Sequence, residues 1–154
     1  MFMNQKGITL AELVIVMAII AICALLIAPN IGAWLPNYRL RSATRDVVSV
    51  LRIAQMKAVA NNVKYGVAFD QASGSFQLYY FSSGNLLPEG AIYTLPSGIQ
   101  FTNITIPINA TLGKPYSEFN TNSTASSGVI ELTNPKGSKK TVRLWGTTGR
   151  VKIE

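Results

Sequence analysis

An unbroken apolar segment near the N-terminus constrains this chain more strongly than any other feature of its sequence. Residues 13–28 read LVIVMAIIAICALLIA, and the wider stretch 8–28 contains a single charge, Glu12. At about 1.5 Å per residue, a helix over 8–28 is about 30 Å long, which matches the hydrocarbon core of a bilayer. Pro29 closes this apolar stretch, because proline cannot continue the helical hydrogen-bond ladder without cost. The segment therefore predicts one membrane-anchoring helix.

The acidic residue at the start of this segment argues against the two simplest interpretations, a secretory signal peptide and a plain signal anchor. A signal peptide is cleaved after its apolar region, and this apolar region is long for that role. A plain anchor does not explain Glu12, because a carboxylate in lipid is costly and is normally paired or functional. Lys6 precedes the segment and favours a cytoplasmic N-terminus by the positive-inside tendency.

The residue types that most catalysis needs are scarce in this chain. It has no histidine, which is the commonest general base and metal ligand. Its single cysteine, Cys23, lies within the apolar segment and has no partner for an intrachain disulfide. The seven acidic residues are scattered, and no phosphate-binding glycine motif occurs. We therefore expect no enzymatic activity, no metal and no cofactor; a membrane-tethered enzyme is the alternative from another class of protein.

After Pro36 the apolar residues follow a helical spacing, which predicts an amphipathic helix over 38–60 that is continuous or nearly so with the membrane helix. Arg41, Arg45 and Arg52 fall on the side opposite to the apolar face. This arginine face is open to three interpretations: contact with a neighbouring subunit, contact with phosphates, or simple solvation, which is the default. The apolar face consists of Leu40, Ala43, Val47, Val50, Leu51, Ala54 and Ala58.

From Val63 onward the apolar residues alternate with a period of two, which predicts β-strands. The expected strands cover residues 63–70, 75–81, 92–96, 98–106, 128–133, 140–146 and 149–154. The first two flank QASG and the fifth and sixth flank NPKGSK, so each pair predicts a hairpin. Residues 110–127 are rich in Asn, Thr, Ser and Gly and predict a long loop. One long helix followed by five to seven strands predicts an α+β fold, with the helix packed on antiparallel sheet.

The C-terminal end is basic, in a chain whose net charge is +7. Arg150 and Lys152 alternate with Val151 and Ile153, so on a strand the two cations share one face, and Arg143 is expected nearby on an adjacent strand. Such a row of cations can follow a phosphate backbone. The alternatives are a solvated edge that prevents aggregation of sheets, and contact with another subunit. The candidate DNA-binding residues are Lys136, Lys139, Lys140, Arg143, Arg150 and Lys152.

The aromatic residue in this basic region has two interpretations. Trp145 offers a surface on which a base can stack, as aromatic side chains do in proteins that bind single strands. The alternation in TVRLWG equally places Trp145 in the core, and core packing is the interpretation that the pattern favours.

The N-terminal region resembles the class III leader and helix of type IV pilins and type II secretion pseudopilins: it reads KGITLAELVIVMAIIAICALLIAPN. The resemblance implies that a prepilin peptidase cuts between Gly7 and Ile8 and methylates the new N-terminus. The family usually has phenylalanine where this chain has Ile8, and its glutamate at the fifth mature position corresponds to Glu12. We thus expect a leader over 1–7, a transmembrane and filament-core helix over 8–35, and a periplasmic domain over 36–154.

This resemblance gives the acidic residue a role in assembly. Cleavage would create a new α-amine at Ile8, and Glu12 would be a costly carboxylate in the membrane until a cation reaches it. In a filament, the Ile8 amine of a neighbouring subunit can pair with Glu12, and fixing register is the best-attested use of a buried ion pair. We therefore expect Glu12→Ala to spare membrane insertion and to impair entry into the filament.

Within this class, the two ends of the domain resemble the FimT/GspH-type minor pilins, and the middle does so poorly. The matching segments are YRLRSATRDVVSVLRIAQMKAVANN and TVRLWGTTGRVKI. Some FimT-like proteins take up DNA through a C-terminal Gly-Arg-x-Arg motif, which corresponds here to Gly149, Arg150, Val151 and Lys152. The lysine in the last position keeps the charge of arginine but loses its bidentate fork.

The resemblance implies two candidate functions for one inner-membrane protein with a periplasmic domain. The first is a minor pilin that helps to prime or cap a type IV pilus and binds DNA for natural transformation. The alternative is an H-type minor pseudopilin of the type II secretion system. In either case the expected partners are other pilins or pseudopilins, the prepilin peptidase and the inner membrane, with DNA as a further candidate for the first.

Overall fold

The computed structural model describes residues 8–154, and for residues 26–31 and 33 it describes the backbone only. The expected leader over 1–7, including Gly7, lies outside the described residues. The chain divides into two compact units between Leu35 and Pro36. One helix, α1 (Leu10–Ala60), contributes residues to both units.

The expected continuity of the two helical segments is confirmed, because α1 continues through Pro29 and Pro36 without a break. A proline removes one backbone donor and strains the preceding turn, but it does not oblige the helix to stop. The other hydrogen bonds of the helix are local and can close on both sides of such a residue.

The amphipathic half of α1 is confirmed, and the helix ends at Ala60 as the pattern predicts. After it, Asn62 adopts a positive φ of 52°, a conformation that asparagine accepts at the C-terminal end of a helix. Each residue of the predicted apolar face is at most 3% exposed. The burial of this face joins the helix to the strands that follow.

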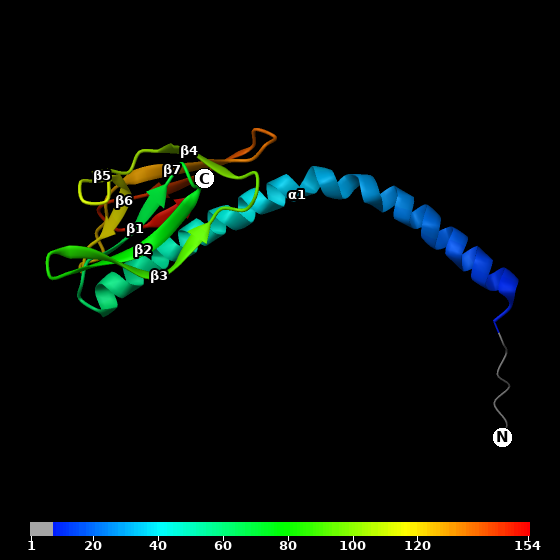
Figure 1. The fold of residues 1–154 in the computed structure, drawn as a ribbon, viewed down its shortest axis with the longest axis horizontal. Coiled ribbons are helices and arrows are strands. Elements are labelled where there is room, and N and C mark those ends of the chain that lie inside the picture. The colour runs from blue at the N-terminus through cyan, green and yellow to red at the C-terminus, as the bar shows by residue number, and fades with distance from the viewer. Residues whose placement is uncertain (1–7) are drawn as a thin grey trace, which may run out of the picture. The chain divides into compact units, whose positions relative to one another are not determined.

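The strands form two antiparallel sheets in the second unit (Figure 1). The described elements are β1 (Tyr65–Asp70), β2 (Ser75–Ser82), β3 (Asn85–Thr94), β4 (Gln100–Ile104), β5 (Ile108–Asn109), β6 (Lys114–Phe119), β7 (Gly128–Thr133), β8 (Lys139–Leu144) and β9 (Val151–Ile153). The first sheet has the order β3-β2-β1-β6-β5, and the second has the order β4-β7-β8-β9. Both predicted hairpins are confirmed, as β1 pairs with β2 and β7 pairs with β8.

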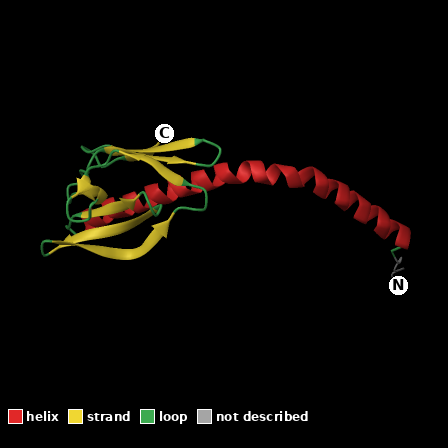
Figure 2. Cartoon of the chain, turned by 45° about the horizontal axis from the view of Figure 1, so that its top comes forward, coloured by secondary structure: helices red, strands yellow, loops and turns green. Residues whose placement is uncertain are grey.

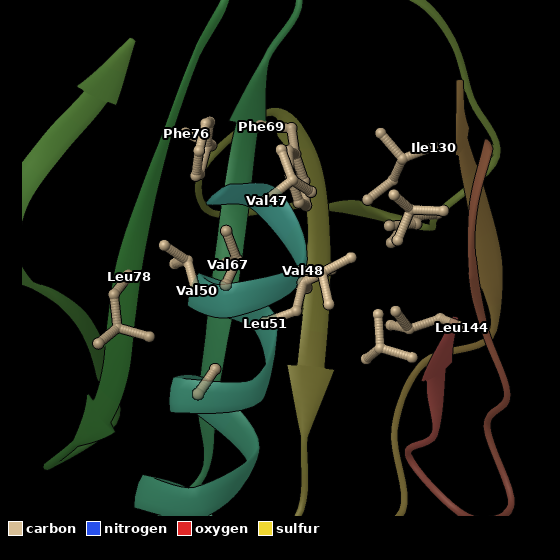
Figure 3. Packing of buried hydrophobic residues seen from close by; sticks show 14 of the residues in the cluster. Val47, Val48, Val50, Leu51, Val67, Phe69, Phe76, Leu78, Ile130 and Leu144 are labelled. Carbon is tan, nitrogen blue, oxygen red and sulfur yellow. The ribbon is translucent and has the colours of Figure 1, made fainter. Parts of the chain in front are cut away.

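Within the second unit the helix runs alongside the strands of both sheets (Figure 2), and one core of buried side chains joins them. Figure 3 shows Val50 on the side of Phe76 and Leu78, and Val48 on the side of Ile130 and Leu144. Because the helix lies against the inner faces of both sheets, its apolar stripe must be wide, and the sequence supplies such a stripe. The predicted α+β fold is confirmed.

Two strand predictions are corrected. Residues 110–127 do not form one long loop, because β6 lies within them and pairs with β1. The turn residues that suggested a loop flank this strand; the Asn109 carboxamide, for example, accepts hydrogen bonds from the backbone amides of Thr111 and Leu112. The strand expected over 92–96 is β3, which begins at Asn85 and contains Pro88. Proline is tolerated there because β3 is an edge strand.

Candidate functional site

Glu12 lies in the first turn of α1, where the helix dipole favours a negative charge. Its backbone amide donates to the Thr9 carbonyl oxygen at 3.1 Å and contacts Thr9 Oγ1 at 3.3 Å. Thr9 thus occupies the N-cap position and Glu12 the third helical position, the spacing of a capping box. The helix therefore begins directly at the proposed mature N-terminus.

The side chain of Glu12 is surrounded by apolar residues of its own unit. Ile8, Leu13, Val16 and Met17 line a shallow hollow with it, and each of these four side chains is about half exposed or more. Glu12 makes no ion pair with any described residue. The arrangement offers a lone carboxylate on an apolar surface, which suits a cationic group brought by another molecule.

Among the residues that the structure describes, no helix has a stretch long and apolar enough to cross a membrane. The predicted span over 8–35 includes residues 26–31 and 33, whose side chains lie outside the description.

The six basic residues predicted as a DNA-binding group do not form one cluster. Lys139 pairs with Glu131 at 2.6 Å, and Arg143 pairs with Glu154 at 3.0 Å. Lys136 lies in the turn between β7 and β8, and Lys140 faces the opposite side of β8 from Lys139.

The last two predicted cations lie together at the edge of the second sheet. Arg150 directly precedes β9 and Lys152 lies within it; both are exposed, whereas Val151 between them is buried. Lys152 is in register with Arg143 on β8, so the expected proximity of these two residues is confirmed.

A groove between α1 and β9 brings Arg150 and Lys152 together with two helix arginines, Arg45 and Arg52. The groove has a volume of about 530 Å³. On the helix, the groove is lined by Arg45, Ser49, Arg52 and Met56. These residues are spaced four, three and four apart and therefore lie on one stripe. Its apolar lining comes from both elements. The lining residues are Arg45, Val48, Ser49, Arg52, Ile53, Met56, Arg150, Val151, Lys152 and Ile153.

Gly149 holds β9 beside the helix. Its φ is +60°, and a Cβ at this position would lie 2.2 Å from the Ser123 carbonyl oxygen and 2.6 Å from Gln55 Nε2. Gln55, on α1, also donates to the Thr148 carbonyl oxygen at 3.3 Å. Only glycine combines this backbone conformation with so close an approach. The glycine of the Gly-Arg motif thus sets the position of Arg150 against the helix.

The cations of the groove differ from most other cations of the second unit in having no carboxylate partner. Ion pairs join Lys57 to Glu89, Lys64 to Glu118 and Lys114 to Asp70, in addition to the two pairs already described. Asp46 is the one acidic residue of this unit outside these pairs. No described carboxylate therefore neutralises the groove by an ion pair.

Two of these ion pairs shift the pKa values of their members. The hydrogen bond from Lys114, followed by one from the Ser73 backbone amide, lowers the pKa of Asp70 from 3.8 to about 2. The hydrogen bond between Lys57 and Glu89 raises the pKa of the lysine and lowers that of the carboxyl. Both pairs are exposed enough to be screened by solvent, so they contribute to local charge balance more than to the stability of the fold.

Trp145 is half-buried, so the prediction that favoured core packing is wrong for this residue. Its ring lies 5.9 Å from the Arg150 guanidinium, within the range of a cation–π contact. The contact engages the Arg150 guanidinium, and part of the ring stays exposed.

Sequence reasoning identified Arg150 and Lys152 but treated Arg45 and Arg52 as a solvated face by default. The seven-residue spacing of the two helix arginines indicated a common stripe, and this was the available signal. The strand that lies opposite that stripe is set by tertiary packing and by Gly149, which the sequence pattern does not reveal.

Two family descriptions match this chain. Residues 2–28 match the prokaryotic N-terminal methylation motif, and residues 43–148 match the type II transport protein GspH. A search of curated protein sequences finds no match.

Solved structures of a minor pseudopilin and of a type IV minor pilin share the fold. The minor pseudopilin EpsH from the type 2 secretion system of Vibrio cholerae superposes with a TM-score of 0.64 at 10% identity, over 75% of this chain and 96% of EpsH. The type IV minor pilin FimU of Pseudomonas aeruginosa superposes with a TM-score of 0.59 at 13% identity, over 77% of this chain and 90% of FimU. At these identities the likeness shows the fold alone, a long helix packed on antiparallel sheets.

Proposed function

Because this chain belongs to the GspH family of type II transport proteins, we propose that it is a minor pseudopilin, a subunit of the filament of a type II secretion system. The family match over residues 43–148 carries the proposal. The basic C-terminus alone favours a type IV pilus, but the family match supports the secretion pseudopilus more strongly. As a pilin-like subunit, the protein has a structural role and is not an enzyme.

The N-terminal motif supplies the route into the filament. A prepilin peptidase cuts between Gly7 and Ile8 and methylates the new amine, and the helix over 8–35 first holds the subunit in the inner membrane. The lone carboxylate of Glu12, on its apolar surface, then accepts the N-terminal amine of a neighbouring pseudopilin. The domain over 36–154 stays in the periplasm and contacts the other subunits.

Deletion of the gene in its own bacterium tests the assignment to secretion. Without the subunit, we expect the amount of exported folded protein in the medium to fall, while surface pili and twitching remain. Restoring the wild-type gene should restore export. Loss of pili or of DNA uptake with intact export would place the protein in a type IV pilus instead.

A DNA-binding minor pilin is the second candidate, and the cations of the groove favour it. Arg45, Arg52, Arg150 and Lys152 are exposed and have no carboxylate partner among the described residues, as a phosphate site requires. A gel-shift titration of the full chain in detergent at two salt concentrations tests this. Binding that weakens with salt and is lost in the double variant Arg150→Gln, Lys152→Gln supports DNA capture; absence of binding at low salt removes it.

A further inference from the structure

The groove between α1 and β9 presents charged side chains. It also presents backbone groups that can form hydrogen bonds with another strand. β9 is the last strand of its sheet, so one of its edges has no neighbouring strand. On the other edge, the Arg150 carbonyl oxygen accepts from the Trp145 amide, and Glu154 exchanges two hydrogen bonds with Thr141. Because the direction of these groups alternates along a strand, the N–H and C=O of Val151 and Ile153 face away from β8.

These free backbone groups open onto the groove, because Val151 and Ile153 line it together with the helix. An exposed edge of this kind is where an extended segment of another protein adds as a further strand. The groove volume of about 530 Å³ lies within the ~300–1,000 Å³ that is typical of ligand sites. The groove thus offers space for a peptide segment, unpaired backbone donors and acceptors, and an apolar lining from Ile53 and Met56.

The positive charge of the groove requires acidic residues in such a segment. Arg45 and Arg52 approach from the helix, and Arg150 and Lys152 from the strand, without a carboxylate paired to any of them among the described residues. Cations on an edge strand alone can be explained as protection against aggregation. That function does not require two further arginines on the facing helix.

We propose that this groove binds an extended, acidic segment of a partner protein, which pairs with the edge of β9 and sets its carboxylates against the four cations. Its alternate residues are apolar and lie on Ile53 and Met56. A nucleic acid satisfies the cations, but it uses neither the apolar lining nor the free amides of Val151 and Ile153. The inference does not depend on which filament takes up the subunit.

Fluorescence anisotropy of the full chain in detergent micelles tests the proposal. The probe is a labelled eight-residue peptide in which glutamate alternates with valine and threonine. Its matched partner is the same peptide with alternate backbone nitrogens methylated, which keeps the charge and removes the donors. A labelled single-stranded oligonucleotide and a labelled duplex are measured under the same conditions.

We expect the peptide to bind more weakly as salt rises, and the methylated peptide to bind about tenfold more weakly or worse. The double variant Arg45→Gln, Arg52→Gln should lower affinity for the peptide by about tenfold or more. Arg41→Gln is the control, because it removes an exposed charge from the same helix outside the groove; its affinity should stay within about twofold.

Three results would overturn the proposal. One is no peptide binding at low salt. Another is equal binding of the methylated and unmethylated peptides, since the edge of β9 would then play no part. The third is an oligonucleotide that binds more tightly than the peptide and loses that affinity in the double variant, which would assign the groove to nucleic acid.

Discussion

Apolar side chains are exposed in one region of the helix and buried in another. In the first unit, Leu13 and Ile19 are 55% and 56% exposed. In the second unit, Val47 and Leu51 are fully buried against the sheets. The first region is apolar on all sides and the second has a single apolar stripe. The second is therefore completed by its own chain, whereas the first must be completed by lipid or by other subunits.

Truncating a leucine of the buried region should destabilise the protein most, whereas the same change in the exposed region should not. Leu51→Ala leaves a cavity in the core and should lower the free energy of unfolding of the second unit by about 2–5 kcal/mol. Leu13→Ala, the matched control, should leave it unchanged, because Leu13 lies outside that core. Chemical denaturation followed by tryptophan fluorescence measures both, and equal losses would break the comparison.

A smaller loss is expected where the strand edge is fastened to the buried half of the helix. Gly149→Ala forces a positive φ on alanine and drives its Cβ into Ser123 and Gln55, so we expect about 1–3 kcal/mol of destabilisation. Gly137→Ala is the control, because Gly137 also has a positive φ but nothing lies within 4 Å of the added Cβ.

The difference between the two glycine variants isolates the contact with the helix. Thermal unfolding of each variant measures it, together with binding of the acidic peptide. A Gly149→Ala protein as stable as Gly137→Ala would show that the position of β9 does not depend on this close approach.

The smallest expected effect is a pH dependence confined to the second unit. In the folded state the pKa of Asp70 is about 2, below its ordinary 3.8, because Lys114 and the Ser73 amide stabilise the carboxylate. A lowered pKa stabilises the fold above pH 3.8, and this contribution is lost as the pH falls toward 2. The wild type should therefore lose its stability advantage over Asp70→Asn across that interval.

Urea denaturation at a series of pH values measures this advantage. Asp46→Asn serves as the control, because Asp46 makes no ion pair with a described residue. An advantage of wild type over Asp70→Asn that stays constant from pH 5 to pH 2 would contradict the role assigned to Lys114.

Features of the fold that depend on local sequence were predictable, and features that depend on long-range pairing were not. The buried stripe of the helix, its end at Ala60 and both hairpins follow from periodicity and turn chemistry, which are local. β6 was missed because Asn109, Ser123 and their neighbours give strong turn signals on both sides of a short strand. Its place beside β1 is a long-range pairing that local patterns do not contain.

The candidate site was predictable to the same extent. Arg150 and Lys152 stand out because they alternate with apolar residues on one short strand. Arg45 and Arg52 join them only after the helix packs against β9, and the ion pairs that occupy Lys139 and Arg143 depend on neighbours across the sheet. The sequence therefore showed where the cations lie along the chain. It did not show which of them form ion pairs or which of them meet in the groove.

Filament entry of a Glu12 variant tests whether the exposed half of the helix is the half that assembles. The measurement is the fraction of full-length Glu12→Ala recovered in cross-linked filaments when it is produced with its partner pseudopilins and the prepilin peptidase. Removing one member of a buried ion pair costs about 3–5 kcal/mol, so we expect incorporation to fall more than tenfold with membrane-bound protein unchanged. Glu118→Ala, which disrupts a surface pair in the second unit, should assemble normally. Incorporation of Glu12→Ala at the wild-type level would show that Glu12 plays no part in filament entry.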